Sequence, residues 1–164
     1  MRRTSIAVVA FLLVGLAGCN DDRIAKLEKQ NQELLAQVKK DHSVQEYDLQ
    51  AKCSKDSKAW FNENWSSDKT TLLLSYSNHY NKSMNKCFIE VEYHYTLQGS
   101  SWVNDMQLWD VYENIKYGDI SVSHLVSAAK PFSIEELVNL CEVYGKKCKT
   151  IDEFNSLVRP YLTD

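Results

Sequence analysis

The chain has 164 residues, with 19 Lys and Arg against 22 Asp and Glu, and a formal net charge of −3 at pH 7. This length holds one ordinary domain plus a short extension. The mildly acidic balance argues against a nucleic-acid partner and gives no sign of attraction to anionic lipid.

The first 18 residues have the three parts of an export signal. Arg2 and Arg3 form a basic start, and residues 6–16 form an apolar run. As a helix this run would be about 16 Å long, too short for a hydrocarbon core of ~30 Å. It ends in Leu16-Ala17-Gly18-Cys19, whose small residues give a peptidase access to the backbone. We therefore expect residues 1–18 to direct export and to be removed, with an uncleaved signal anchor as the alternative.

The Leu-Ala-Gly-Cys ending resembles the lipobox of bacterial lipoproteins. The resemblance implies cleavage before Cys19, a diacylglyceryl thioether on its sulfur and often an N-acyl chain such as palmitate. Two or three such chains hold a protein on a membrane, whereas one does so only marginally. Asn20 follows the cysteine, and in enterobacterial lipoproteins a residue other than Asp there favours the outer membrane. The expected location is the periplasmic face of the outer membrane, with the inner membrane as the alternative.

Four of the five Cys remain once Cys19 carries lipid, in a chain expected to enter an oxidising compartment. Four Cys allow three pairings. We favour the disulfides Cys53–Cys87 and Cys141–Cys148, because the second closes a short loop and the first is what then remains. Zinc is the alternative, but the spacings are not paired CxxC units. No metal and no other cofactor is predicted.

After the signal, the sequence predicts helix. Heptad positions a and d of residues 22–40 are occupied in turn by Ile24, Leu27, Asn31, Leu34 and Val38. This pattern favours either a homo-oligomeric coiled coil through residues 24–38 or a monomeric amphipathic helix. A second helix is predicted over 43–65, and nothing between the two forces a break. The predicted organisation is a signal over 1–18, a lipidated Cys and spacer over 19–42, and a disulfide-bonded domain over 43–164.

Strands are predicted in the middle of the chain. Strict alternation over 87–97 indicates the clearest strand, with one buried and one largely wet face. A hairpin loop at 98–101 leads to a returning strand at 102–112, and a weaker strand lies near 116–122. Upstream, a short β-prone segment, residues 70–76, precedes a predicted loop at 78–82.

The C-terminal part is predicted to be helical. Ser133 with Glu136, and Thr150 with Glu153, each have the capping-box spacing. They predict helices over 134–144, ended by Gly145, and over 151–158, with Pro160 stopping or bending the second. The predicted fold class is α+β, in which an N-terminal helical spacer leads to an antiparallel hairpin or small meander packed with N- and C-terminal helices.

No Ser/His/Asp, HExxH or phosphate-loop spacing is present, so no catalytic residue is predicted. The densest polar cluster, Tyr76 to Phe88, resembles a signature met in uncharacterised exported bacterial proteins, which implies no known activity. Its candidate binding loop consists of Asn78, His79, Tyr80, Asn81 and Lys82. We favour a loop held by its own hydrogen bonds and pinned by Cys87. The alternative is a site that presents polar edges to a sugar, peptide or protein.

These patterns predict a membrane-anchored envelope lipoprotein that is not an enzyme. It would act through contact with another envelope protein, as an adaptor, an inhibitor or an immunity-type protein. The alternative is a ligand-binding or cell-wall-directed hydrolytic protein that uses the Tyr76–Phe88 loop. A third hypothesis is a structural stalk that oligomerises through residues 24–38.

Overall fold

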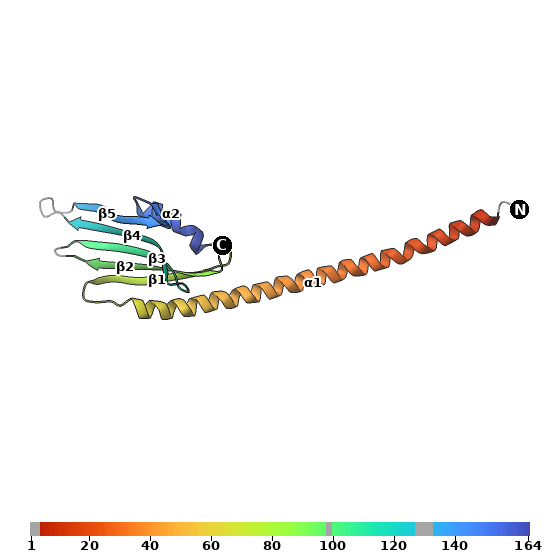
Figure 1. The fold of residues 1–164 in the computed structure, drawn as a ribbon, viewed down its shortest axis with the longest axis horizontal. Coiled ribbons are helices and arrows are strands. Elements are labelled where there is room, and N and C mark those ends of the chain that lie inside the picture. Colours follow the sequence, from red (N-terminus) through yellow and green to blue (C-terminus); the bar gives the residue numbers. More distant parts are fainter. Residues whose placement is uncertain (1–3, 98–99, 127–132) are drawn as a thin grey trace. The chain divides into compact units, whose positions relative to one another are not determined.

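The computed structural model describes the backbone of residues 4–97, 100–126 and 133–164, and the side chains of these ranges from residue 21 onward. Helix α1 (Thr4–Asn64) comes first, and helix α2 (Ile151–Leu162) comes last. Between them lie β1 (Thr71–Asn81), β2 (Lys86–Thr96), β3 (Trp102–Asp110), β4 (Ile115–Val126), β5 (Ile134–Val143) and β6 (Lys146–Lys147) (Figure 1). The predicted α+β class is confirmed.

The chain divides into two compact units, Met1–Gln45 and Glu46–Asp164. Helix α1 runs through both without a break, as expected where neither Gly nor Pro lies between residues 19 and 64. In the first unit the apolar heptad side chains of residues 24–38 are 50–59% exposed. Among the helical residues whose side chains are described, no stretch is long and apolar enough to cross a membrane.

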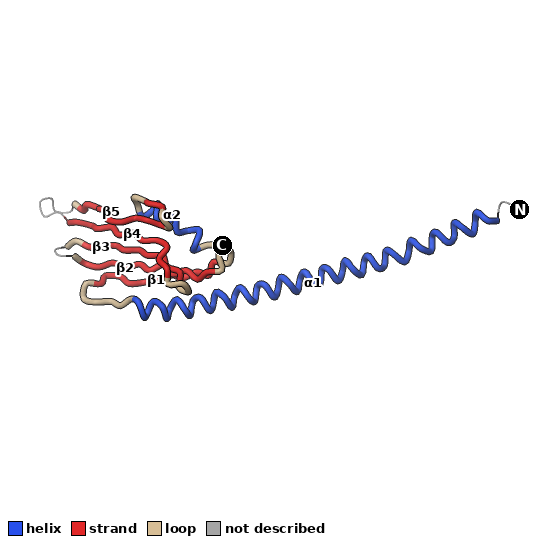
Figure 2. The backbone as a smooth tube through the Cα atoms, viewed as in Figure 1, coloured by secondary structure: helices blue, strands red, loops and turns tan. Residues whose placement is uncertain are grey.

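The second unit is built on one sheet whose strands follow sequence order, β1 to β6, each antiparallel to the next (Figure 2). Strands β2, β3 and β4 form where strands were predicted near 87–97, 102–112 and 116–122. The predicted hairpin loop at 98–101 falls partly outside the described residues. The small meander is therefore a sheet of six strands, larger than the sequence suggested.

Residues 134–144 were predicted to form a helix, and that prediction was wrong, because they form β5 and the start of its turn. The prediction rested on the capping-box spacing of Ser133 and Glu136 and on Gly145 as a helix end, and the structure places these residues before, in and after a strand. Ile120 of β4 pairs with Cys141, and Val122 pairs with Val138, so a step of two residues on β4 matches a step of three on β5. This β-bulge sets Val138 and Cys141 at a spacing that a helix also shows, so the apolar residues gave no sign against a helix.

The loop predicted at 78–82 was also wrong. Strand β1 continues through Asn81, with Asn78 opposite Ile89 and His79 opposite Phe88. Cross-strand pairing overrides the local preference of Asn and His for turns. Only Lys82, the last residue of the predicted loop, lies in the turn before β2.

Strand β2 is covered on both faces over its first half, so the predicted wet face is absent there. Cys87, Ile89 and Val91 are fully buried on one face, and Phe88 is fully buried on the other. The first three belong to clusters that include Cys53 and Trp60 of α1. The predicted disulfide Cys53–Cys87 is formed and joins α1 to β2.

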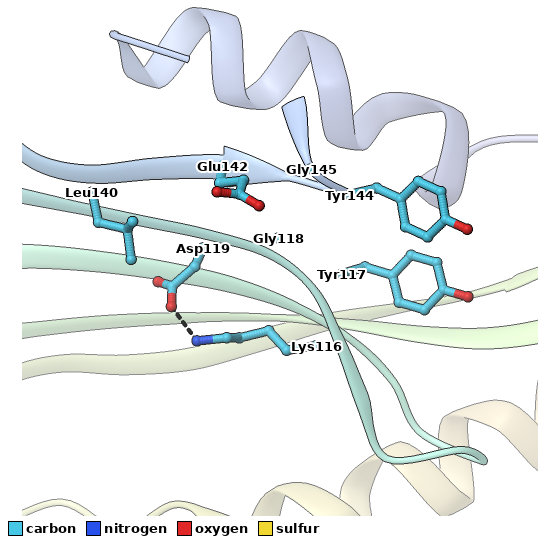
Figure 3. A pocket seen from close by; sticks show the side chains of 8 residues that line it. All are labelled: Lys116, Tyr117, Gly118, Asp119, Leu140, Glu142, Tyr144 and Gly145. Carbon is cyan, nitrogen blue, oxygen red and sulfur yellow. Dashed lines mark hydrogen bonds and ion pairs between the residues drawn. The ribbon is translucent and has the colours of Figure 1, made fainter. Parts of the chain in front are cut away.

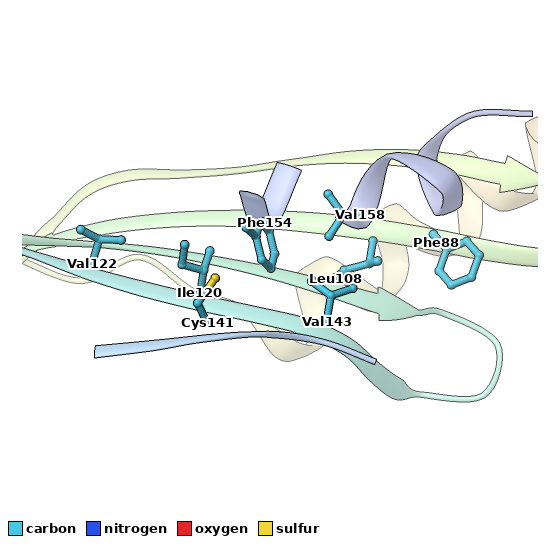
Figure 4. Packing of buried hydrophobic residues seen from close by; sticks show 8 residues of the cluster. All are labelled: Phe88, Leu108, Ile120, Val122, Cys141, Val143, Phe154 and Val158. Atoms are coloured by element: carbon cyan, nitrogen blue, oxygen red, sulfur yellow. The ribbon is translucent and has the colours of Figure 1, made fainter. Parts of the chain in front are cut away.

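Helix α2 covers the opposite face of the sheet. Its Phe154 and Val158 point onto Phe88, Leu108 and Val143 (Figure 4). The predicted disulfide Cys141–Cys148 lies at the rim of this cluster.

The predicted N-terminal cap of α2 is confirmed. Thr150 Oγ1 accepts a hydrogen bond from the Glu153 N–H at 3.1 Å, and the Glu153 carboxylate accepts one from the Lys149 N–H at 2.7 Å. The helix extends to Leu162, beyond the predicted end at residue 158, with Pro160 inside it.

Glu90 on β2 provides a test of sheet electrostatics. Burial, and then the nearby Glu92 charge, raises the pKa of Glu90. Because the folded chain holds this proton more tightly than the unfolded chain, the folded state loses stability as pH rises above the ordinary value of 4.5. We expect Glu90→Gln to raise the Tm at pH 7 by roughly 2–4 °C and to leave it nearly unchanged at pH 3.5. Melts at both pH values, with the exposed Glu63→Gln as control, check this; an equal change at both pH values would contradict it.

Candidate functional site

A shallow hollow of about 220 Å³ lies where the end of β5 runs beside β4, next to the β5–β6 turn (Figure 3). It is lined by Lys116, Tyr117, Gly118, Asp119, Leu140, Glu142, Tyr144 and Gly145. Pockets that enclose small molecules usually measure ~300–1,000 Å³. The hollow therefore fits a single side chain better than a whole cofactor or drug-sized ligand.

An exposed aromatic ring stands at one end of the hollow. Tyr144 is 72% exposed, and its ring stacks on that of Tyr117, with centroids 5.5 Å apart and planes 14° apart. The φ angles of Tyr144 and Gly145 are 46° and 77°, as a two-residue type I′ hairpin turn requires. Asn or Gly is the usual first residue of such a turn, and a Tyr there costs about 1 kcal/mol. The chain thus accepts strain at a residue whose ring faces solvent.

The hollow also has an excess of negative charge. Asp119 and Glu142 pair directly across β4 and β5. The Lys116 ammonium forms an ion pair with Asp119 and also lies 5.8 Å from the centre of the Trp109 ring. Among the described residues Glu142 forms no ion pair, although Lys147 of β6 is its register partner across the strands. A carboxylate outside any ion pair, beside an aromatic face, is an arrangement that attracts Lys or Arg.

Strand β5 itself is the outer edge of the sheet next to this hollow. Strand β6 pairs only with Glu142 and Val143. Within the described ranges, no strand pairs with the outer side of residues 134–140. Four apolar side chains of this segment are 40–54% exposed, namely Ile134, Leu137, Val138 and Leu140. An open, apolar strand edge is a ready template for another strand.

Of the predicted binding loop, Asn81 is fully buried and is used inside the fold. Its amide Nδ2 donates to the carbonyl oxygens of Pro160 at 2.9 Å and Thr163 at 3.1 Å. Its Oδ1 accepts from the Met84 N–H at 3.0 Å and the Ser83 hydroxyl at 2.7 Å. One side chain therefore fastens the C-terminal end of α2 to the β1–β2 turn.

The other four predicted loop residues also contact neighbouring elements. The Tyr80 hydroxyl donates to Asn85 Oδ1 at 2.6 Å, and Asn78 Oδ1 accepts from Gln50 Nε2 at 3.4 Å. His79 Nε2 lies 3.4 Å from an Asp164 carboxylate oxygen, and Lys82 forms an ion pair with Glu46 at 2.7 Å. The N–H that Lys82 donates to Asp164 lowers the pKa of that carboxyl, against the opposing effect of burial. None of these five residues lines the hollow beside Glu142.

The sequence did not single out Tyr117, Glu142 or Tyr144. The available signal was Gly145, which favours a tight turn as readily as a helix end. Interpreting 134–144 as a helix turned Gly145 into a helix end and concealed that signal.

Among the described residues, no group of three or more His, Cys, Asp or Glu side chains is placed to hold a metal ion. Cys19, the predicted lipidation site, lies outside the residues whose side chains are described. No protein-family model, no curated protein and no solved structure matches this chain. Its function must therefore be inferred from its own residues.

Proposed function

We propose that this protein is a lipid-anchored lipoprotein of the bacterial envelope that acts, without catalysis, by contact with another envelope protein. The observation that carries the proposal is Leu16-Ala17-Gly18-Cys19 behind a basic and apolar start. The two disulfides support export, because such bonds persist in oxidising compartments and are rare in the cytosol. The proposed location is the periplasmic face of the outer membrane.

Contact with a protein is supported by the surface of the second unit. Strand β5 exposes apolar side chains along an open edge, and exposed apolar patches on small domains mark partner sites. The adjoining hollow has room for a side chain. An adaptor, an inhibitor and an immunity-type protein would all use such a surface.

The alternative of a ligand-binding or hydrolytic protein that works through the Tyr76–Phe88 loop has less support. The amide of Asn81 and the hydroxyl of Tyr80 are both engaged in contacts inside the fold. A homo-oligomer through residues 24–38 remains a proposal, supported by the half-exposed apolar heptad positions.

Replacing the proposed lipid-bearing residue tests the anchor. We expect Cys19→Ser to reduce acyl labelling to background, to leave the precursor uncleaved and to prevent stable insertion through lipid, because serine has no thiol to form the thioether. Metabolic labelling with a clickable palmitate analogue, followed by membrane fractionation, measures all three. The matched control is Asn20→Asp, which should keep the label and shift the protein toward the inner membrane. Normal labelling and cleavage of Cys19→Ser would refute the proposal.

A further inference from the structure

We infer that the outer edge of β5 is a docking site for an extended, basic segment of a partner protein. The segment would add to the sheet as a further strand beside residues 134–140 and would place a Lys or Arg side chain in the hollow next to Glu142. The inference rests on the proposed function, because it names the surface and the chemistry of the partner contact proposed there.

The backbone of β5 supplies the first argument. Its inner side pairs with β4 along the strand. On its outer side, Glu142 and Val143 pair with β6, and the Cys141 carbonyl accepts from the Cys148 N–H at 3.0 Å. The segment from Ile134 to Leu140 has no such neighbour in the described part of the chain. A strand of about seven residues is long enough for a peptide to bind by main-chain hydrogen bonds.

The side chains of this segment supply the second argument. All seven residues from Ile134 to Leu140 are exposed, so neither face of the strand is covered there. Apolar positions would give a partner strand pockets and contact area, as happens when a peptide adds to a sheet edge.

Charge decides the kind of partner. The open segment of β5 carries Glu135 and Glu136 and no Lys or Arg, and Glu136 also lies 3.5 Å from His124 Nδ1. Basic side chains on a partner strand would lie opposite these carboxylates and neutralise them. A second copy paired along residues 134–140 would instead bring four carboxylates into one pair of strands, because each copy contributes two. Like charges in a ladder are destabilising, so a basic heterologous segment fits the edge better than self-pairing.

The hollow gives the partner's cation a place to bind. Lys116 already pairs with Asp119. Glu142, whose register partner on β6 is Lys147, forms no ion pair among the described residues, so its carboxylate can accept an incoming cation. The exposed ring of Tyr144, stacked on Tyr117, offers an aromatic face at the same hollow. A carboxylate and an aromatic face together favour Lys or Arg over an apolar side chain. The strained backbone conformation of Tyr144 would thus serve to hold its ring at the proposed binding surface.

A peptide-binding experiment tests the inference on the full-length protein in detergent micelles. The probe is an end-blocked, fluorescent peptide of eight residues that alternates Val and Lys. Its controls are the same peptide with Glu in place of Lys, a version N-methylated at every second amide, and empty micelles. By anisotropy we expect the Val–Lys peptide to bind at least tenfold more tightly than either control peptide. Equal binding of the Glu peptide or of the N-methylated peptide would overturn the inference.

Two variants locate the binding. Glu135→Lys with Glu136→Lys should weaken binding of the Val–Lys peptide at least tenfold. Tyr144→Asn should weaken it roughly threefold to tenfold while keeping or raising the Tm, because Asn-Gly suits a type I′ turn. Charged residues on a strand edge also deter aggregation. If that is all the two glutamates do, the double Lys variant will bind the peptide as tightly as the parent chain, and the inference fails.

Two further measurements separate the remaining outcomes. Sedimentation that shows a dimer of the full-length protein, lost in Leu140→Lys, would assign the edge to a second copy and overturn the heterologous partner. The Cys19→Ser protein should bind the Val–Lys peptide as tightly as the parent chain. Lipidation and edge binding are therefore scored independently, and failure of one is distinguishable from failure of the other.

Discussion

Replacing both Cys53 and Cys87 with Ser is expected to reduce the free energy of unfolding by about 4 kcal/mol, from the chain-entropy cost of opening the loop. The sequence separation is 34 residues, and the bond joins α1 to β2 where both cysteines are fully buried. Ser57 Oγ lies 3.3 Å from Cys87 Sγ, so a buried serine at position 87 has a hydrogen-bonding neighbour. The loss in free energy of unfolding should therefore come mainly from the missing cross-link and not from an unpaired serine hydroxyl.

Denaturant and thermal unfolding of the full-length protein under non-reducing conditions measure this loss. For a unit the size of Glu46–Asp164, about 4 kcal/mol corresponds to a Tm decrease of roughly 15 °C. The matched control is Cys141→Ser with Cys148→Ser, whose sequence separation of 7 residues predicts a smaller loss, about 2.5 kcal/mol. A greater loss in the short-loop variant would show that loop entropy does not determine the order.

Both disulfides could be predicted because four cysteines allow few pairings, and the start of α2 could be predicted because its cap is a short local motif. Once Cys19 is set aside, a short loop between Cys141 and Cys148 leaves one partner for Cys53. Thr150 and Glu153 lie three residues apart and form their cap without help from the rest of the chain.

The identity of β5 depends on a partner strand and was missed. The capping-box spacing of Ser133 and Glu136 indicated a helix, and a bulge opposite Val122 of β4 sets Val138 and Cys141 three residues apart, which a helix also does. Helix and bulged strand then share one pattern, and only pairing with β4 decides between them. Because β5 was not predicted, the site at Glu142 and Tyr144 was not predicted either, since its residues come together only when β4 lies beside β5.

The end of β1 shows a related case. Residues 78–82 make local hydrogen bonds from Tyr80 and Asn81, but most of their side-chain contacts reach other elements. No local signal indicates that Asn81 donates hydrogen bonds to Pro160 and Thr163, about 80 residues away. Such long-range polar contacts have no periodicity from which they could be read.

Asn81→Ala is expected to reduce the free energy of unfolding by about 3 kcal/mol, since it leaves buried polar groups without partners. The side chain is fully buried, and its amide donates to the carbonyl groups of Pro160 and Thr163 and makes a longer contact of 3.4 Å with that of Tyr161. It also accepts two hydrogen bonds from the β1–β2 turn. Denaturant unfolding measures the loss, and hydrogen exchange should show faster opening of residues 158–162 than of residues 151–154.

Asn81→Asp separates the donated bonds from the accepted ones. A carboxylate still accepts from the Met84 N–H and the Ser83 hydroxyl, but at neutral pH it has no proton for the Pro160 and Thr163 carbonyls, and its charge repels them. We therefore expect Asp to be at least as destabilising as Ala at pH 7 and to recover part of the stability when protonated near pH 3.5. Asn78→Ala is the matched control, with an expected loss below about 1 kcal/mol, because its amide oxygen makes one long contact of 3.4 Å. If Asn81→Asp unfolds like the parent chain at pH 7, the amide does not hold the end of α2.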